Sequence, residues 1–153
     1  MKPPEAASGP LPVWSLRSVA VLTTVTADGP HAIPVSAPVR AADDLVLIGL
    51  RSDRDSLGRI RAYPSVALTL LTAGDVAFTA RGRASVLARP LGRSPDYVAV
   101  AIEVLHVDDH RQAAFAMTAG VERDWQDESE RSSLGDRVAA LREMGDPRDV
   151  AAG

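Results

Sequence analysis

The stretch from Ser18 to Val39, SVAVLTTVTADGPHAIPVSAPV, decides the fold of this chain. Residues 18–26 are rich in valine and threonine, which favour a strand. Asp28-Gly29 then predicts a tight hairpin turn, because glycine tolerates positive φ. Residues 31–39 predict the returning strand, in which Pro34 and Pro38 lack ladder donors and indicate an edge, a bulge or a bend.

The pattern downstream of this hairpin predicts further strands, for a total of six. Asp43-Asp44 turns into residues 45–50, LVLIGL, a strand that is apolar on both faces and is therefore expected to be buried on both sides. The last three strands are separated by a turn at residues 73–75 and a loop at residues 89–95. They are residues 66–72, 76–87 and 97–107.

Helix signals interrupt the strands once and return near the C-terminus. Residues 51–63 predict a short helix with Leu57 and Ile60 on one face, a cap at Ser52, Asp53 or Asp55, and a stop at Pro64. Residues 110–119 predict another short helix, ended by Gly120. Residues 131–144 predict a longer one, with Gly145 and Pro147 beyond its end and one apolar face formed by Leu134, Val138 and Leu141.

Composition excludes several classes of protein. The chain has 153 residues, which suits one domain, and no cysteine, so disulfides, thiolate catalysis and cysteine-based metal sites are excluded. No apolar run approaches the ~20 residues of a membrane-spanning helix and no secretory signal follows Met1, so no membrane partner and a cytoplasmic location are expected. The pI of about 5.6 disfavours nucleic-acid binding. The three histidines form no metal-binding motif, so no metal site is expected.

Charge is spread unevenly along the chain. Residues 51–95 contain eight arginines and three acidic residues, a net charge of +5. Residues 96–153 contain six arginines and thirteen acidic residues, a net charge of −7. The middle of the chain is therefore a candidate anion site, and its last third is expected to be a solvated acidic segment.

The order of these elements resembles the pyridoxamine 5'-phosphate oxidase-like split-barrel family. The matching residues are the hairpin from Asp28 to Val35, the helix end and strand from Ile60 to Leu68 (IRAYPSVAL), and Gly82-Arg83-Ala84. The resemblance covers about residues 18–107. It implies a mainly β fold, a six-stranded antiparallel split barrel with a short helix between strands three and four and a C-terminal helix.

Three parts are expected along the chain. Residues 1–13 are expected to form a disordered arm, since prolines and small residues dominate there. Residues 14–120 are expected to form the barrel, and residues 121–153 an acidic segment whose helix packs on it. The family further implies a homodimer that binds FMN, or a related deazaflavin, between its subunits, together with a small-molecule substrate.

In this family the cofactor contacts come from the second strand, the end of the third strand and the start of the following helix. Carried across, these contacts fall on His31, Ile33, Pro34, Val35, Ser36, Leu50, Arg51, Arg54, Ser56 and Arg59. No catalytic residue is predicted, because in a flavoprotein the cofactor performs the redox chemistry.

Ser56 is the position at which the sequence departs from the family. Members often have a lysine or arginine eight residues before the helix-ending proline, where it meets the cofactor phosphate. A serine hydroxyl at a helix N-terminus also donates to phosphate, and Arg51, Arg54 and Arg59 supply charge nearby. The alternative is a solvated helix with pairs such as Asp55 with Arg59.

Three functions stay open from the sequence. The leading one is a flavin- or deazaflavin-dependent oxidoreductase; the others are a non-catalytic flavin or haem binder and a cofactor-free dimeric scaffold. Trp125 either stacks on a flavin or anchors the C-terminal segment to the barrel, and we favour anchoring. Arg81 and Arg83 either bind an anion across the dimer or pair with the acidic C-terminal segment, and we favour pairing.

Overall fold

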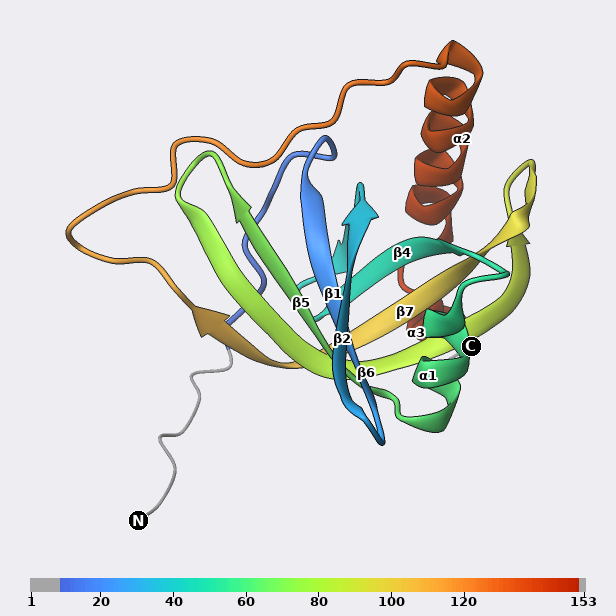
Figure 1. Ribbon diagram of the computed structural model, residues 1–153, viewed down its shortest axis with the longest axis horizontal. Coiled ribbons are helices and arrows are strands. Elements are labelled where there is room, and N and C mark those ends of the chain that lie inside the picture. Colours follow the sequence, from blue (N-terminus) through green and yellow to red (C-terminus); the bar gives the residue numbers. More distant parts are fainter. Residues whose placement is uncertain (1–8, 152–153) are drawn as a thin grey trace.

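A computed structural model describes residues 9–151, which form one curved antiparallel sheet and three helices (Figure 1). The sheet has seven strands in the order β2-β1-β5-β6-β7-β4-β3. The strands are β1 (Val19–Thr26), β2 (Gly29–Ser36), β3 (Val39–Ala42), β4 (Leu45–Arg51), β5 (Ser65–Thr72), β6 (Val76–Leu91) and β7 (Ser94–Asp109). The helices are α1 (Asp55–Ala62), α2 (Glu128–Met144) and α3 (Pro147–Ala151). The mainly β fold with a short helix after LVLIGL and a C-terminal helix is thus confirmed.

The main core fills the inside of the curved sheet. It is built from aliphatic side chains of most strands together with Leu57 and Ile60 of α1 and Phe78 of β6. Trp14 packs against this core: its ring centroid lies 5.5 Å from that of Phe78, and its Nε1 donates to the carbonyl of Pro38 at 2.9 Å. Burial of these apolar groups stabilises the barrel and holds α1 against its inner side.

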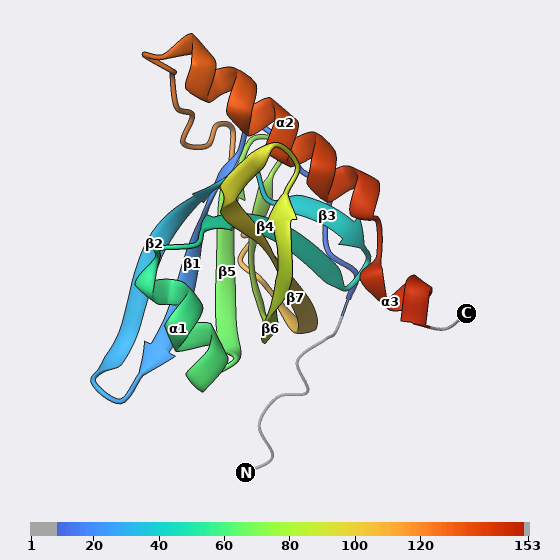
Figure 2. The ribbon, with the colours of Figure 1, turned by 90° about the vertical axis from the view of Figure 1, so that its right-hand side faces the viewer.

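A second cluster lies between α2 and the outer face of β3, β4 and β7. Val46, Ile48 and Leu50 of β4 face the main core, whereas Leu45 and Leu47 face the second cluster. The prediction that LVLIGL is buried on both sides is therefore confirmed. Val138 and Leu141 bring the apolar face of α2 onto this cluster. Figure 2 shows the result: α2 lies obliquely across the β3–β4 side of the sheet, and α1 lies beside β1 and β2.

The strand predicted over residues 31–39 is two strands, which raises the count from six to seven. Ala37 has φ +50°, in the left-handed region, and Pro38 follows it without an N–H. The chain bends there, so that β2 ends on one edge of the sheet and β3 lies on the other.

Three other local predictions are wrong. Residues 89–95 are not a loop: β6 and β7 continue as a long hairpin that turns at Gly92 and Arg93, with φ +59° at Gly92. None of the expected caps bonds to the start of α1, whose N-cap position is Arg54. Residues 110–119 form no helix, because their backbone bonds elsewhere: Met117 accepts from the N–H of Asp75 at 3.0 Å and donates to the Asp75 carboxylate at 2.9 Å.

The predicted N-terminal arm, residues 1–13, lies partly outside the described residues. Within its described part, Leu11 is only 2% exposed and its N–H donates to the carbonyl of Asp43 at 2.8 Å. Arg40 also donates from Nε and Nη2 to the carbonyl of Leu11. The fixed part of the chain therefore begins before Trp14. No helix among residues 9–151 is long and apolar enough to cross a membrane.

Candidate functional site

The barrel is split between β2 and β4. These strands contact each other, yet β2 is an edge strand and pairs only with β1, so no backbone ladder closes the sheet at this point. A cavity of about 280 Å³ lies along the split, and we call it the split pocket. Its lining comes from β2 and β4 on two sides and from the C-terminal segment on a third. An edge strand has unpaired N–H and C=O groups, so this wall offers backbone donors and acceptors.

A second cavity, of about 370 Å³, surrounds the N-terminus of α1 and is called the α1 pocket. Ile33, Arg51 and Arg54 line both cavities, which therefore adjoin. Apolar and aromatic residues outnumber charged ones in the split pocket, although four arginines and Glu130 also line it, whereas the α1 pocket is lined mainly by charged residues. Together the two cavities form one continuous hollow that has arginines in both parts and most of its apolar and aromatic lining in the split pocket.

Every residue expected from the sequence to contact a cofactor lines this hollow. The split pocket is lined by Ile33, Pro34, Val35, Ser36, Leu50, Arg51 and Arg54, and the α1 pocket adds His31, Ser56 and Arg59. The structure therefore brings together residues that are up to 28 positions apart, from His31 to Arg59. This proximity follows from the split, which places the end of β4 and the start of α1 beside β2.

The α1 pocket has more donors than acceptors. Arg51 is tied to Asp53 by two hydrogen bonds of 3.2 Å, whereas no ion pair of Arg54 or Arg59 with another described residue is present. Asp55 does not pair with Arg59, in contrast to the solvated-helix alternative. Ser56 is 2% exposed and lies in the first turn of α1, where backbone N–H groups lack acceptors within the helix. Such a turn attracts anions.

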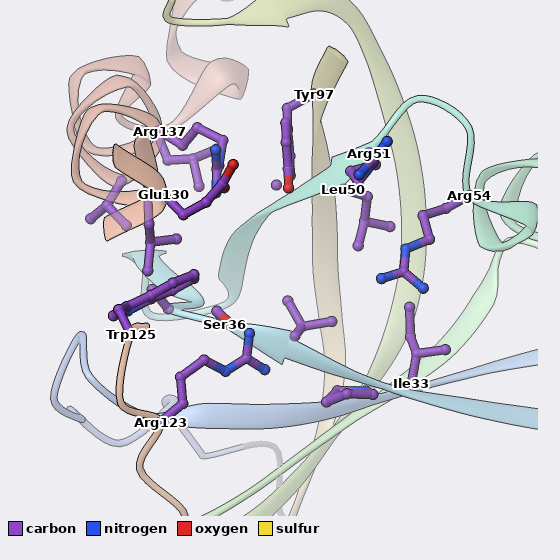
Figure 3. Close-up of a pocket in the computed structure, with 17 residues that line it drawn as sticks. Ile33, Ser36, Leu50, Arg51, Arg54, Tyr97, Arg123, Trp125, Glu130 and Arg137 are labelled. Atoms are coloured by element: carbon purple, nitrogen blue, oxygen red, sulfur yellow. The ribbon is translucent and has the colours of Figure 1, made fainter. Parts of the chain in front are cut away.

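The C-terminal segment supplies lining residues that were not predicted. Arg137 of α2 lies with its Cζ 3.8 Å from the ring centroid of Tyr97, and Arg123 lies with its Cζ 5.9 Å from that of Trp125. Figure 3 shows these side chains around the split pocket with Glu130 beside them. The remaining lining residues from this part of the chain are Leu134, Val138 and Leu141. Each arginine thus lies against an aromatic ring at the edge of the cavity.

A sequence signal existed for Arg137 but not for Tyr97. Arg137 follows Leu134 by three positions and precedes Leu141 by four, so it lies on the apolar face of an amphipathic helix, where an arginine is unusual. Tyr97 reaches the site only through the β4–β7 register, which places it opposite Arg51. Trp125 lies at the pocket, a position compatible with both of its proposed roles.

Arg81 pairs with the acidic last third of the chain, although with β7 and not with the segment beyond it. Its Nε lies 2.7 Å from Oδ2 of Asp108. This contact holds the pKa of the Asp108 carboxyl below its ordinary value. The pair lies on the outward face of the sheet, away from the split pocket, and so does not contribute to the candidate site.

No protein-family model and no curated protein matches the sequence. Solved structures do match. A putative pyridoxamine 5'-phosphate oxidase from Listeria innocua is 17% identical, with a TM-score of 0.52 over 61% of this chain and 89% of that one. HupZ from Group A Streptococcus is 16% identical, with a TM-score of 0.54 over 67% and 90%. An F420 reductase is 17% identical, with a TM-score of 0.52 over 61% and 91%. The fold of this chain is therefore that of the pyridoxamine 5'-phosphate oxidase-like split barrels.

Proposed function

We propose that this chain binds FMN or a related deazaflavin in the hollow formed by the split pocket and the α1 pocket, and works as an oxidoreductase. The observation that supports this most directly is the set of residues that line the hollow. The split pocket has apolar and aromatic side chains suited to a planar ring beside its arginines, and the α1 pocket has arginines and a helix N-terminus suited to a phosphate. The fold is also shared with an F420 reductase and a putative pyridoxamine 5'-phosphate oxidase.

The residues of the α1 pocket fit a phosphate group. Arg54 and Arg59 bring two guanidinium groups that form no ion pair with another described residue, and Ser56 brings a hydroxyl at the first turn of α1. Charged forks of this kind bind phosphate oxygens strongly. Asp53 and Asp55 oppose the anion, but Arg51 already neutralises Asp53. A cationic side chain at position 56 is therefore not required for a phosphate to bind here.

The residues of the split pocket fit a flavin-like ring. Val35 and Leu50 are 3% and 5% exposed and form an apolar floor, and the free edge of β2 offers backbone hydrogen bonds to the polar rim of a ring. When bound, the ring supplies hydride or electron transfer. The protein's own residues hold and orient it, and Trp125 and Tyr97 shield its surroundings from water.

The test compares FMN with riboflavin, its phosphate-free counterpart. In the double variant Arg54→Ala/Arg59→Ala, affinity for FMN should fall at least about tenfold, because charge-assisted bonds to phosphate are lost, while affinity for riboflavin stays unchanged. Arg61→Ala is the matched control, since Arg61 lies on the same helix but does not line either cavity. Visible absorbance and flavin emission report binding directly.

The same titrations decide between the possible cofactors and functions. Coenzyme F420 in parallel with FMN distinguishes a deazaflavin protein from a flavin protein. Bleaching of the bound cofactor by a reduced nicotinamide, followed by reoxidation with an acceptor, separates an enzyme from a binder. If the protein binds neither FMN nor coenzyme F420 at millimolar concentration, the proposal is contradicted. Equal losses for FMN and riboflavin in the double variant contradict the placement of the phosphate.

The proposal includes a homodimer formed through the outward face of β1, β5, β6 and β7, on which Arg81 and Arg83 of β6 lie among apolar side chains. Four large apolar side chains on this sheet are exposed by 41–47%: Val21, Val25, Leu71 and Leu105. Val25 and Leu105 line one shallow hollow together with Thr23. Val21 lies on the same face of β1 as Thr23 and Val25, because the three residues are two positions apart along the strand. Burial of such a surface against a second copy removes apolar area from water.

A further inference from the structure

Arg137 is a buried cation within the split pocket. It is only 6% exposed, although it lies in the middle of α2 and its side chain ends in a guanidinium group. The stack on Tyr97, at 3.8 Å, covers one face of the guanidinium. Its N–H groups all lie in the guanidinium plane, so stacking leaves them free to donate along that plane.

No hydrogen bond or ion pair joins this guanidinium to another residue whose side chain is described. Its nitrogens are not among the fully buried atoms without a partner, so they face the open space of the split pocket, where an anion can reach them. Among the described residues that line the split pocket, Glu130 supplies the single carboxylate. Its backbone precedes that of Arg137 by two helical turns, or about 10 Å along the axis of α2. It forms no ion pair with Arg137 within 4.0 Å.

Arg123 adds a second guanidinium to the same cavity. It reaches the pocket from the segment before α2 and packs near the ring of Trp125 (Figure 3). The split pocket therefore contains four arginine side chains, Arg51, Arg54, Arg123 and Arg137, against the single carboxylate of Glu130 among its described lining residues. Apolar groups from α2 complete the wall and lower the local dielectric, which strengthens attraction for an anion.

We infer that Arg137, with Arg123, forms an oxyanion subsite in the split pocket that takes the carboxylate or phosphate group of the second reactant. The subsite is separate from the phosphate-binding position at α1, because Arg137 and Arg123 line the split pocket alone. The substrate class is accordingly a small anionic molecule. The role of the anion as the second reactant of a redox reaction rests on the proposed function. The anion site itself does not depend on that function.

Isothermal titration with benzoate, inorganic phosphate and uncharged benzyl alcohol tests the subsite in the full chain, with and without FMN. Benzoate should bind and benzyl alcohol should not. Arg137→Met should weaken benzoate binding at least about tenfold, since a charged fork is lost. Arg142→Met is the matched control on the same helix, because Arg142 is exposed and does not line the split pocket. Phosphate distinguishes the sources of oxyanion: binding that follows Arg137 belongs to this subsite, and binding that follows Arg54 and Arg59 belongs to α1.

Glu130→Gln separates the subsite from a structural role of Arg137. If the guanidinium serves an external anion, removing the nearby carboxylate should tighten benzoate binding about two- to fivefold, because a like charge is removed. Should Arg137→Met loosen α2, Arg137→Lys keeps the charge and the stem but loses the planar fork, and benzoate binding should still weaken. Unchanged benzoate affinity in both Arg137 variants overturns the inference.

The two proposals fail in different ways. FMN binding together with benzoate binding that ignores Arg137 contradicts the subsite and leaves the cofactor site intact. Benzoate binding that depends on Arg137 in a chain that takes neither FMN nor F420 contradicts the proposed function and supports the anion site. Benzoate binding that weakens in Glu130→Gln contradicts the assignment of the guanidinium to an external oxyanion.

Discussion

Arg148 in α3 donates two hydrogen bonds to the carboxylate of Asp44 in the turn between β3 and β4, at 2.6 and 3.1 Å. The same guanidinium donates to Asp146 at 2.6 and 2.9 Å, and the side chain of Asp146 is 14% exposed. The pKa values of both carboxyls are held below the ordinary value by these bonds. The end of α2 is thereby fastened to the sheet edge, which helps to keep Arg137 over the split pocket.

Replacing Arg148 by glutamine should lower the Tm by no more than about 2–4 °C, because exposed ion pairs contribute about 0.2–1 kcal/mol. The loss should shrink in 1 M salt, which screens the pair. Calorimetry of Arg148→Gln beside Arg142→Gln checks this, since no ion pair of Arg142 with another described residue is present. A loss that persists unchanged in high salt would mean that packing, and not charge, fastens α3.

Acid should destabilise the fold over a narrow range of pH. The pKa of Asp109 is lowered from 3.8 to about 2 by hydrogen bonds from Arg111, and those of Asp44, Asp108, Asp127 and Asp146 are lowered as well. A group whose pKa is lower in the folded state stabilises it above the unfolded pKa and loses this contribution as the pH falls. The Tm should therefore change little from pH 7 to 5 and fall between about pH 4 and pH 2.

Thermal scans in steps of one pH unit check the acid prediction, with Asp109→Asn as the internal comparison. This variant should start from a lower Tm at pH 7 and lose less on acidification, because one of the titrating groups is gone. A steady decline of the Tm from pH 7 to 5 would contradict the assignment of acid sensitivity to these aspartates.

Local signals predicted the elements of the fold, whereas its closure depended on contacts that no local pattern encodes. The Asp28-Gly29 hairpin, the doubly buried LVLIGL strand and the helix after it all follow from residue preference and periodicity. A bend was one of the effects expected from Pro34 and Pro38, but the passage of the chain from one sheet edge to the other at Ala37 was not predicted, because the positive φ occurs at a residue that gives no sign of it. The helix predicted at residues 110–119 failed because bonds with Asp75 replaced helical ones.

The candidate site shows the same division. The side formed by β2, β4 and α1 was predicted through the family resemblance, and its residues fall between His31 and Arg59. The side formed by Tyr97, Trp125 and α2 depends on the β4–β7 register and on the path of the chain after β7. The one overlooked clue was local: an arginine between Leu134 and Leu141 on the apolar face of a helix.

Gly82 should be the least replaceable glycine of the sheet. It lies at the register shift between β6 and β7, and a Cβ there would lie 1.9 Å from the carbonyl oxygen of Glu103. Gly82→Ala should destabilise the protein by about 1–3 kcal/mol or more, since backbone must move to accept the methyl group. Gly135→Ala in α2 should stabilise it by about 0.5–1 kcal/mol, because open space surrounds that position. Urea unfolding of both variants checks the contrast, and similar effects of the two substitutions would contradict this packing.

If the protein is the proposed homodimer, a substitution in the dimer face should halve its mass in solution. Light scattering should give twice the chain mass of 16.1 kDa for the native protein. Leu105→Arg should give the chain mass itself, because a further buried cation beside Arg81 and Arg83 opposes association. Val121→Arg is the control: Val121 is 70% exposed and lies in the segment before α2, outside the proposed face, so the dimer should persist. A native protein of single-chain mass would remove the dimer while leaving the hollow beside β2, and FMN titration of Leu105→Arg then reveals whether one copy suffices to hold the cofactor.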